Sequence, residues 1–235
     1  MRWLDRDLYW RLRGQLRHGH FIWSAQTLWW MAQELYHEWR FGVQTVMDYP
    51  SELDPTQECH HYQGMAYAQL LQILDEVAPR SRAEQEVFLD AGCGMGRALA
   101  AASRYPFERV SGFDYAPELV ALARLNIGQI AARRRCGSIE VDWGDASQYE
   151  MADEVTLVLL FNPFRGTVMR AFMGQLRASF HRRPRRLRIV FGNPRHFDAT
   201  EYPWLGLLRE WQHYNPYMGE RTGFQMRTLL LEVQS

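Results

Sequence analysis

Lysine is absent from this chain of 235 residues, so all 27 basic residues are arginines, and 27 acidic residues balance them. An exclusive use of arginine is what a GC-rich coding sequence produces, and we attach no function to it. The formal net charge of +0 excludes a global electric field that would draw the protein to nucleic acid or to an acidic membrane.

Cysteine is scarce, and its three positions, Cys59, Cys93 and Cys136, show neither a paired spacing nor a zinc-binding pattern. We therefore expect a protein of the reducing cytoplasm without a metal site. Residues 58–61 include possible metal ligands, but their spacing is irregular, and a solvated turn is the simpler interpretation.

Long apolar runs are also missing. The first ten residues lack the apolar core of a secretory signal. The most apolar early stretch, residues 21–39, is too polar to span a membrane, because five polar side chains interrupt it: Gln26, Gln33, Glu34, His37 and Glu38.

Residues 1–80 are predicted to form a helical cap without a strand. Leucines recur every four residues from Leu4 to Leu16, which is typical of an amphipathic helix. Further helices are predicted over 24–40, with Ser24 as N-cap, and over 63–77. Six of the nine tryptophans fall in the first 40 residues. We expect them to form core between the cap and the main domain. A lid over an apolar acceptor, a homodimer face and a membrane-surface helix are the alternatives.

The glycine-rich segment after the first buried run organises the rest of the chain. The run ends on Asp90, and Gly92, Gly94 and Gly96 follow at alternate positions before a helix-forming stretch. This order predicts a strand, a tight loop and a helix. Glycines allow a ligand to approach the backbone, and a helix start offers unpaired N–H groups, so the segment is a candidate cofactor cradle. A dinucleotide fingerprint would need a third glycine where Arg97 stands.

Polar residues also follow the next predicted strands. Asp114 ends a strand and lies 18 residues beyond Gly96, a distance at which an acidic residue often pairs with ribose hydroxyls. Asp145 and Asn162 follow the two strands after it. Because ligands bind at the carboxyl ends of parallel strands, we expect these side chains to share one crevice. The predicted strands span residues 109–114, 138–143 and 155–161.

Three segments resemble motifs of the class I S-adenosylmethionine (SAM)-dependent methyltransferases. Motif I corresponds to Asp90 with its alternate glycines, motif II to Asp114, and motif III to Gly-Asp-Ala at 144–146. The resemblance covers about residues 86–235. It implies an α/β fold with a doubly wound, seven-stranded, mostly parallel sheet, and SAM as cofactor. In this plan a helix spans 168–180 and a fifth strand spans 187–191. The plan ends with a segment over 205–214, which is either helix or strand, and a segment over 224–233. An antiparallel hairpin at the sheet edge turns near 218–219.

The resemblance also implies roles for single residues. The glycine loop lies under the methionine part of SAM, and Asp90 helps to fix its ammonium group. Tyr115 stands beside the adenine ring, Asp145 accepts from the adenine amino group, and the backbone N–H of Ala146 reaches the ring. In one bacterial group a tyrosine-containing segment before motif I touches the cofactor. Tyr62 is its counterpart, although the proline usual there is absent.

The methyl acceptor is expected beyond the fourth strand. Asn162-Pro163-Phe164 resembles the Asn-Pro-Pro-Phe/Tyr motif of amino-group methyltransferases, without its second proline. In that motif the asparagine accepts from the amine and the aromatic ring stacks on a planar substrate. Asn193 begins a second Asn-Pro pair after the next strand, and nearby His196 is the preferred candidate base. Weaker candidate bases are Tyr202, His213 and Tyr214.

The arginine-rich run at 181–188 invites a nucleic-acid interpretation, but it contains no interleaved aromatic residue, and a solvated loop is favoured. We therefore predict a cap over 1–80 and a SAM-binding domain over 81–235. The predicted enzyme methylates nitrogen or oxygen of a small apolar or aromatic metabolite held between cap and Asn-Pro-Phe corner. A protein or nucleic-acid methyltransferase and a non-catalytic SAM-binding module are the alternatives.

Overall fold

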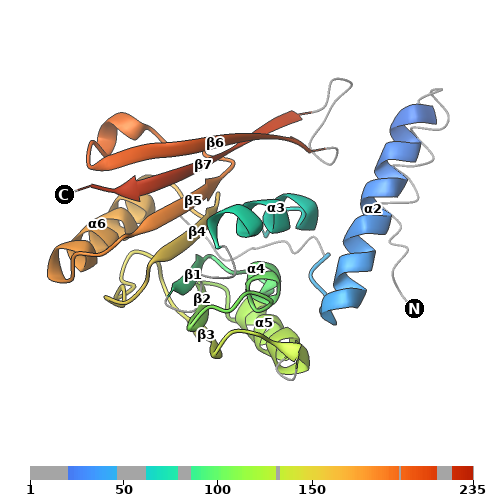
Figure 1. The fold of residues 1–235 in the computed structure, drawn as a ribbon, viewed down its shortest axis with the longest axis horizontal. Helices are drawn as coiled ribbons and strands as arrows, with labels where there is room; N and C mark the ends of the chain where they lie inside the picture. The colour runs from blue at the N-terminus through green and yellow to red at the C-terminus, as the bar shows by residue number, and fades with distance from the viewer. Residues whose placement is uncertain are drawn as a thin grey trace.

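The computed structural model describes residues 21–46, 62–78, 86–130, 133–195, 197–215 and 224–234. Their fold is shown in Figure 1. Seven strands form one sheet in the order β3-β2-β1-β4-β5-β7-β6. The strands are β1 Val87–Ala91, β2 Arg109–Asp114, β3 Ser138–Trp143, β4 Leu157–Phe161, β5 Arg188–Gly192, β6 Leu205–Asn215 and β7 Phe224–Val233.

The first five strands are parallel, and the hairpin of β6 and β7 adds two antiparallel strands beside β5. Every residue of β1 and β5 is buried, as expected for parallel strands that are covered on both faces. The chain leaves β1 toward β2 on one side and later returns to β4 on the other. This reversal is the point where doubly wound folds bind ligands. The predicted doubly wound, seven-stranded sheet is confirmed.

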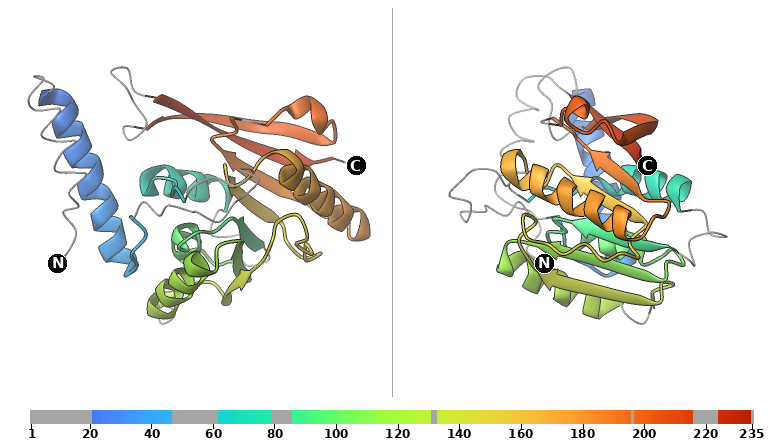
Figure 2. Two further views of the ribbon diagram at one scale, coloured as in Figure 1. Left: turned by 180° about the vertical axis from the view of Figure 1, so that it is seen from behind. Right: turned by 90° about the vertical axis from the view of Figure 1, so that its left-hand side faces the viewer.

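Helices cover both faces of the sheet (Figures 1 and 2). Alternate residues of each strand point to opposite faces, so Phe88 packs with α3, α4 and α5, whereas Leu89 packs with α6. Asp90 follows Leu89 in β1 and therefore shares the face of Phe88. The helices are α2 Phe21–Phe41, α3 Tyr67–Val77, α4 Arg97–Ala102, α5 Pro117–Ile130 and α6 Gly166–Arg182, with a short 3-10 helix, η3, over Ala199–Glu201.

Helix α3 belongs to the main core. Leu70, Ile73 and Leu74 lie in the same cluster as Phe88 of β1, so the predicted domain division at residue 80 does not separate two cores. The helix begins at Tyr67 and not at residue 63 as predicted, because residues 63–66 run as an extended segment past the glycine loop.

Helix α2 begins at Phe21, so the predicted N-cap at Ser24 is wrong. It stands beyond α3 and α4, away from the sheet (Figure 1). Glu34, Glu38 and Phe41 form its buried side, while Trp39 on the opposite side is 76% exposed. The expectation that the aromatic residues form core is therefore wrong for this face. Its exposed large side chains are Leu28, Trp29, Leu35, Tyr36 and Trp39.

Several predictions fall outside the described residues: the amphipathic helix from Leu4 to Leu16, the segment 58–61, His196 and the turn at 218–219. Within the described part of the chain, no helix is both long and apolar enough to cross a membrane.

Candidate functional site

The loop between β1 and α4 requires glycine for two separate reasons. Gly92, Gly94 and Gly96 all have φ between +53° and +82°, a region that side chains with a Cβ rarely adopt. Close neighbours add a steric reason. A Cβ at Gly92 would lie 2.5 Å from the Cβ of Pro163, and a Cβ at Gly94 would overlap the ring of Tyr62. The loop therefore touches both the corner after β4 and the segment before α3.

Two carboxylates lie beside this loop. Asp114, at the end of β2, accepts from the backbone N–H of Gly94 at 2.8 Å and from that of Ala116 at 3.0 Å. Burial raises the pKa of Asp114, although these N–H groups act in the opposite direction. Asp90 is 4% exposed, and no described residue donates a hydrogen bond to its carboxylate. Burial, together with the charge of Asp114, raises the pKa of Asp90 to about 8.

Tyr62 lies on the glycine loop, and its ring is in contact with Gly94. Its hydroxyl donates to the backbone carbonyl of Thr45 at 3.1 Å. Burial raises the pKa of Tyr62 to about 12, against the charge of Arg97. The tyrosine therefore remains a neutral donor at physiological pH and connects the loop to the segment after α2.

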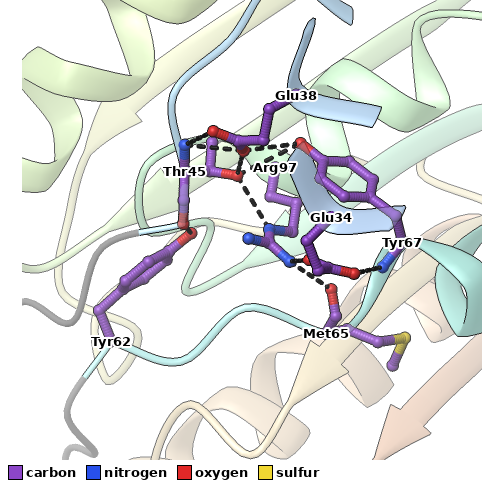
Figure 3. Close-up of polar contacts among 7 residues, drawn as sticks. All are labelled: Glu34, Glu38, Thr45, Tyr62, Met65, Tyr67 and Arg97. Atoms are coloured by element: carbon purple, nitrogen blue, oxygen red, sulfur yellow. Dashed lines mark hydrogen bonds and ion pairs between the residues drawn. The ribbon is translucent and has the colours of Figure 1, made fainter. Parts of the chain in front are cut away.

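Arg97, the first residue of α4, is the centre of a buried polar network (Figure 3). Its guanidinium pairs with Glu34 of α2 and donates to the hydroxyl of Thr45 at 2.9 Å and to the carbonyl of Met65 at 3.1 Å. Its relative exposure is 7% and that of Glu34 is 3%. A buried charge without a partner is costly, so each member of this pair depends on the other.

Glu38 extends the network from the next turn of α2. Its carboxylate accepts from the backbone N–H of Thr45 at 2.8 Å and from the hydroxyl of Tyr67 at 3.2 Å. The Thr45 hydroxyl also donates to it. The N–H of Tyr67 donates to Glu34 at 2.9 Å. The network thereby fastens α2 to the residue that follows the glycine loop (Figure 3).

The remaining predicted cofactor residues lie at the ends of β2 and β3. Tyr115 is 42% exposed, and its carbonyl accepts from the indole N–H of Trp143 at 2.9 Å. Asp145 is half-buried and accepts from the N–H of Ser147 at 2.8 Å. Ala146 is 5% exposed and lies in the core cluster on the α6 face. The cofactor-binding roles of these residues stay predictions.

Two asparagines stand at the ends of neighbouring strands. Asn162 and Asn193 both adopt the left-handed region, with φ of 46° and 52°. Asn193 is 3% exposed, and its side-chain oxygen accepts from the Arg195 guanidinium at 3.2 Å. The nitrogen of its amide is buried without a partner in the described structure. Each asparagine thus turns the chain sharply at the carboxyl edge of the sheet.

The other residues predicted near the acceptor lie in different places. Pro163 is in contact with the glycine loop, whereas the ring of Phe164 is buried in the core and meets Phe172 edge-on at 5.4 Å. Of the weaker candidate bases, Tyr202 lies on the α6 face of the sheet. His213 is buried on β6, and burial lowers its pKa despite the nearby Glu76.

Sequence reasoning missed the role of Glu34, Glu38 and Thr45. The two glutamates served only as evidence against a membrane span, although their spacing of four residues places them on one side of a helix. Arg97 stood out only because it occupies the position of a glycine in another motif. The only local signal of a buried ion pair was the position of this arginine, directly after the glycine loop.

Known proteins resemble this chain in sequence and in fold. Residues 88–182 match the model of a family described as a methyltransferase domain. No curated protein matches the sequence significantly. The fold is similar to that of an RNA methyltransferase from Salinibacter ruber in complex with S-adenosyl-L-homocysteine, with 19% identity and a TM-score of 0.50 over 74% of this chain and 95% of the other.

Two structures from Pyrococcus horikoshii are also similar. A putative RNA methyltransferase has 15% identity and a TM-score of 0.54 over 78% of this chain and 92% of the other. TYW2, in complex with MeSAdo, has 14% identity and a TM-score of 0.53 over 81% of this chain and 72% of the other. The sheet order, the glycine loop and the match agree: residues 88–182 form a methyltransferase domain within a fold of the class I SAM-dependent kind.

Proposed function

We propose that this methyltransferase acts on a nitrogen or oxygen atom of a small apolar or aromatic metabolite held between Asn162 and Asn193. The observation that carries the proposal is the pairing of Phe161 with Gly192, which sets the two asparagines side by side after neighbouring parallel strands. Both have a left-handed backbone, and Asn193 has a buried amide nitrogen without a partner in the described structure. A buried polar group normally has a hydrogen-bond partner, so the amide favours a ligand with an acceptor atom.

The residues beside the glycine loop fit SAM as cofactor. Asp90 is a buried carboxylate to which no described residue donates, and the ammonium group of SAM would supply a donor. Asp114 accepts from the backbone N–H groups of Gly94, Tyr115 and Ala116 and retains a lone pair for the ribose hydroxyls. Asp145 and the backbone of Ala146 would contact the adenine edge, with Tyr115 against the ring face. Tyr62 would close the site from the side of the cap.

When bound, SAM would supply a methyl group on a positively charged sulfur, and the sulfur would be the leaving group when the acceptor atom attacks the methyl carbon in line. The chain must therefore align the acceptor and keep water out. The amide oxygen of Asn162 would accept a hydrogen from an acceptor nitrogen or hydroxyl, while the amide nitrogen of Asn193 would donate to a second polar atom. A general-base role for His196 remains a prediction.

A small acceptor is supported by the seclusion of Asn193, which at 3% exposure would not meet a flat protein surface. The formal net charge of +0 also supports it, because nucleic-acid binding is dominated by phosphate contacts. Phe164 has no part in this proposal, since its ring is in the core. Proteins of similar fold from Salinibacter ruber and Pyrococcus horikoshii are described as an RNA methyltransferase and a putative RNA methyltransferase, so RNA is the second candidate acceptor.

The test combines a binding assay with an activity assay. Calorimetric titration with SAM should show binding, and methyl transfer from tritiated SAM into cell extract, separated by size, should label the small-molecule fraction. Label in RNA or protein would overturn the small-acceptor proposal. Asn162→Ala should abolish transfer and change SAM affinity only a few fold, while Gln129→Ala, at an exposed position on α5, should change neither. Loss of SAM binding by Asn162→Ala would contradict the acceptor role.

A further inference from the structure

A pocket lies on the α6 side of the sheet, opposite to α4 and the glycine loop. It has a volume of about 490 Å³ and is formed between α6 and the segment that enters β6. This volume is within the range of small-molecule sites. Its walls include Arg170, Gly174 and Arg177 on one side and Glu201, Tyr202 and Trp204 on the other.

The wall from α6 is positively charged. The helix contains no acidic residue from Gly166 to Arg182. Arg170, Gly174 and Arg177 have the spacing of one helix side. No described carboxylate lies within ion-pair distance of Arg170 or Arg177, whereas Arg182 pairs with Asp153 at 2.7 Å. The two guanidiniums in the pocket therefore carry charge that no described protein group neutralises.

The opposite wall offers an aromatic surface. The Arg177 guanidinium carbon lies 5.8 Å from the centre of the Trp204 ring. Tyr202 meets Trp204 edge-on at 6.0 Å and stacks on Phe197 at 5.3 Å, so the position of the indole is supported from behind. Trp204 itself is only partly buried. A planar ring could therefore stack on it beside a guanidinium.

The centre of the pocket is open. A Cβ at Gly174 would meet no heavy atom within 4 Å, so the exposed helix surface between the two arginines has room for a ligand. Glu201 also lines the pocket but makes no ion pair with either of them. The pocket thus combines two guanidiniums without a carboxylate partner among the described residues, an aromatic face and a separate carboxylate.

We propose that this pocket binds a nucleotide. The base would stack on Trp204, the phosphates would pair with Arg170 and Arg177, and Glu201 would accept from the ribose hydroxyls. The two arginines start about 10 Å apart along the helix axis, so each guanidinium can pair with a different phosphate group. Such a ligand is either a free nucleoside diphosphate or a segment of single-stranded RNA. This inference does not depend on the identity of the methyl acceptor.

The first experiment measures binding of ADP by calorimetry and of a labelled single-stranded RNA of twelve nucleotides by fluorescence anisotropy. Adenosine and pyrophosphate serve as fragments of the ligand. Tighter binding of RNA identifies a strand as the natural ligand, and tighter binding of ADP identifies a free nucleotide. Absence of binding of both at millimolar concentration overturns the proposal.

Variants then locate the site. Arg170→Gln with Arg177→Gln should weaken binding at least tenfold, and Gly174→Leu should do the same by filling the pocket without removing a charge. Gly174→Ala is the matched control for the helix, and Arg183→Gln is the control for an exposed charge outside the pocket. Both controls should bind within threefold of the wild type.

Circular dichroism and SAM titration should be unchanged for all of these variants, which separates this proposal from the one on methyl transfer. Binding that survives both the double arginine variant and Gly174→Leu would overturn the assignment to this pocket. Failure of the wild type to bind SAM would instead contradict the cofactor site and leave the nucleotide experiment intact.

Discussion

Replacement of Asp90 by asparagine should stabilise the free protein at alkaline pH while abolishing its affinity for SAM. In the folded protein the pKa of Asp90 is raised to about 8 by burial and by Asp114, compared with 3.8 for the ordinary carboxyl. Below pH 3.8 the carboxyl is protonated in both states and has no effect. As the pH rises from 3.8 toward 8, Asp90 ionises only in the unfolded state, so the free energy of unfolding falls through this window. Above pH 8 the contribution of Asp90 to stability is at its lowest.

The size of this effect follows from the same window. At about 1.4 kcal/mol per pH unit, the interval from pH 3.8 to about 8 sets an upper bound of about 6 kcal/mol. Local relaxation reduces it, and we expect Asp90→Asn to gain about 2 to 6 kcal/mol at pH 8 and close to nothing at pH 4. Asparagine has the same shape and no charge, so the gain reports the removed carboxylate.

The assay is urea unfolding of both proteins at pH 4, 6 and 8 without SAM, followed by SAM titration at pH 8. Asp142→Asn, an exposed position on β3, is the control and should change stability by less than about 0.5 kcal/mol. A variant that is less stable than the wild type at pH 8, or a difference that is independent of pH, would refute the reasoning. Retained SAM affinity would refute the ammonium-binding role.

Three further predictions concern the loop and its network. Glu34→Gln should lower the free energy of unfolding in urea by about 3 kcal/mol, because it leaves Arg97 buried with less counter-charge. The double variant Glu34→Leu with Arg97→Met should cost less than the sum of its two single variants. Strict additivity would contradict an interaction between the two residues. Tyr62→Phe should cost about 1 kcal/mol and leave SAM affinity within a few fold. Tyr62→Ala should weaken SAM binding more than tenfold in calorimetry, and equal effects of the two variants would exclude a role for the ring. Gly94→Ala should lower the unfolding midpoint and abolish SAM binding, because φ is +53° and the Cβ overlaps Tyr62; native stability would show that the loop can adapt.

The predicted strands were confirmed wherever the signal was local. Buried parallel strands are continuous apolar runs, and the runs before Asp90 and Asn162 became β1 and β4. Helix boundaries were less accurate. The helix predicted over 63–77 begins at Tyr67, because Tyr62 and Gly64 are held against Gly94 and Arg97 in an extended segment. Such contacts lie far apart in sequence, so helical periodicity alone could not locate this boundary.

The sequence by itself determined the sheet, the glycine loop and the methyltransferase domain, because apolar runs, glycine spacing and acids at strand ends are local patterns. Only the tertiary structure decided which residues hold the cap to that loop. The pairing of Arg97 with Glu34, the position of Tyr62 on Gly94 and the pocket between α6 and Trp204 each join distant segments. The indole of Trp204 lies far from Arg177 in sequence, and only the fold brings the two together.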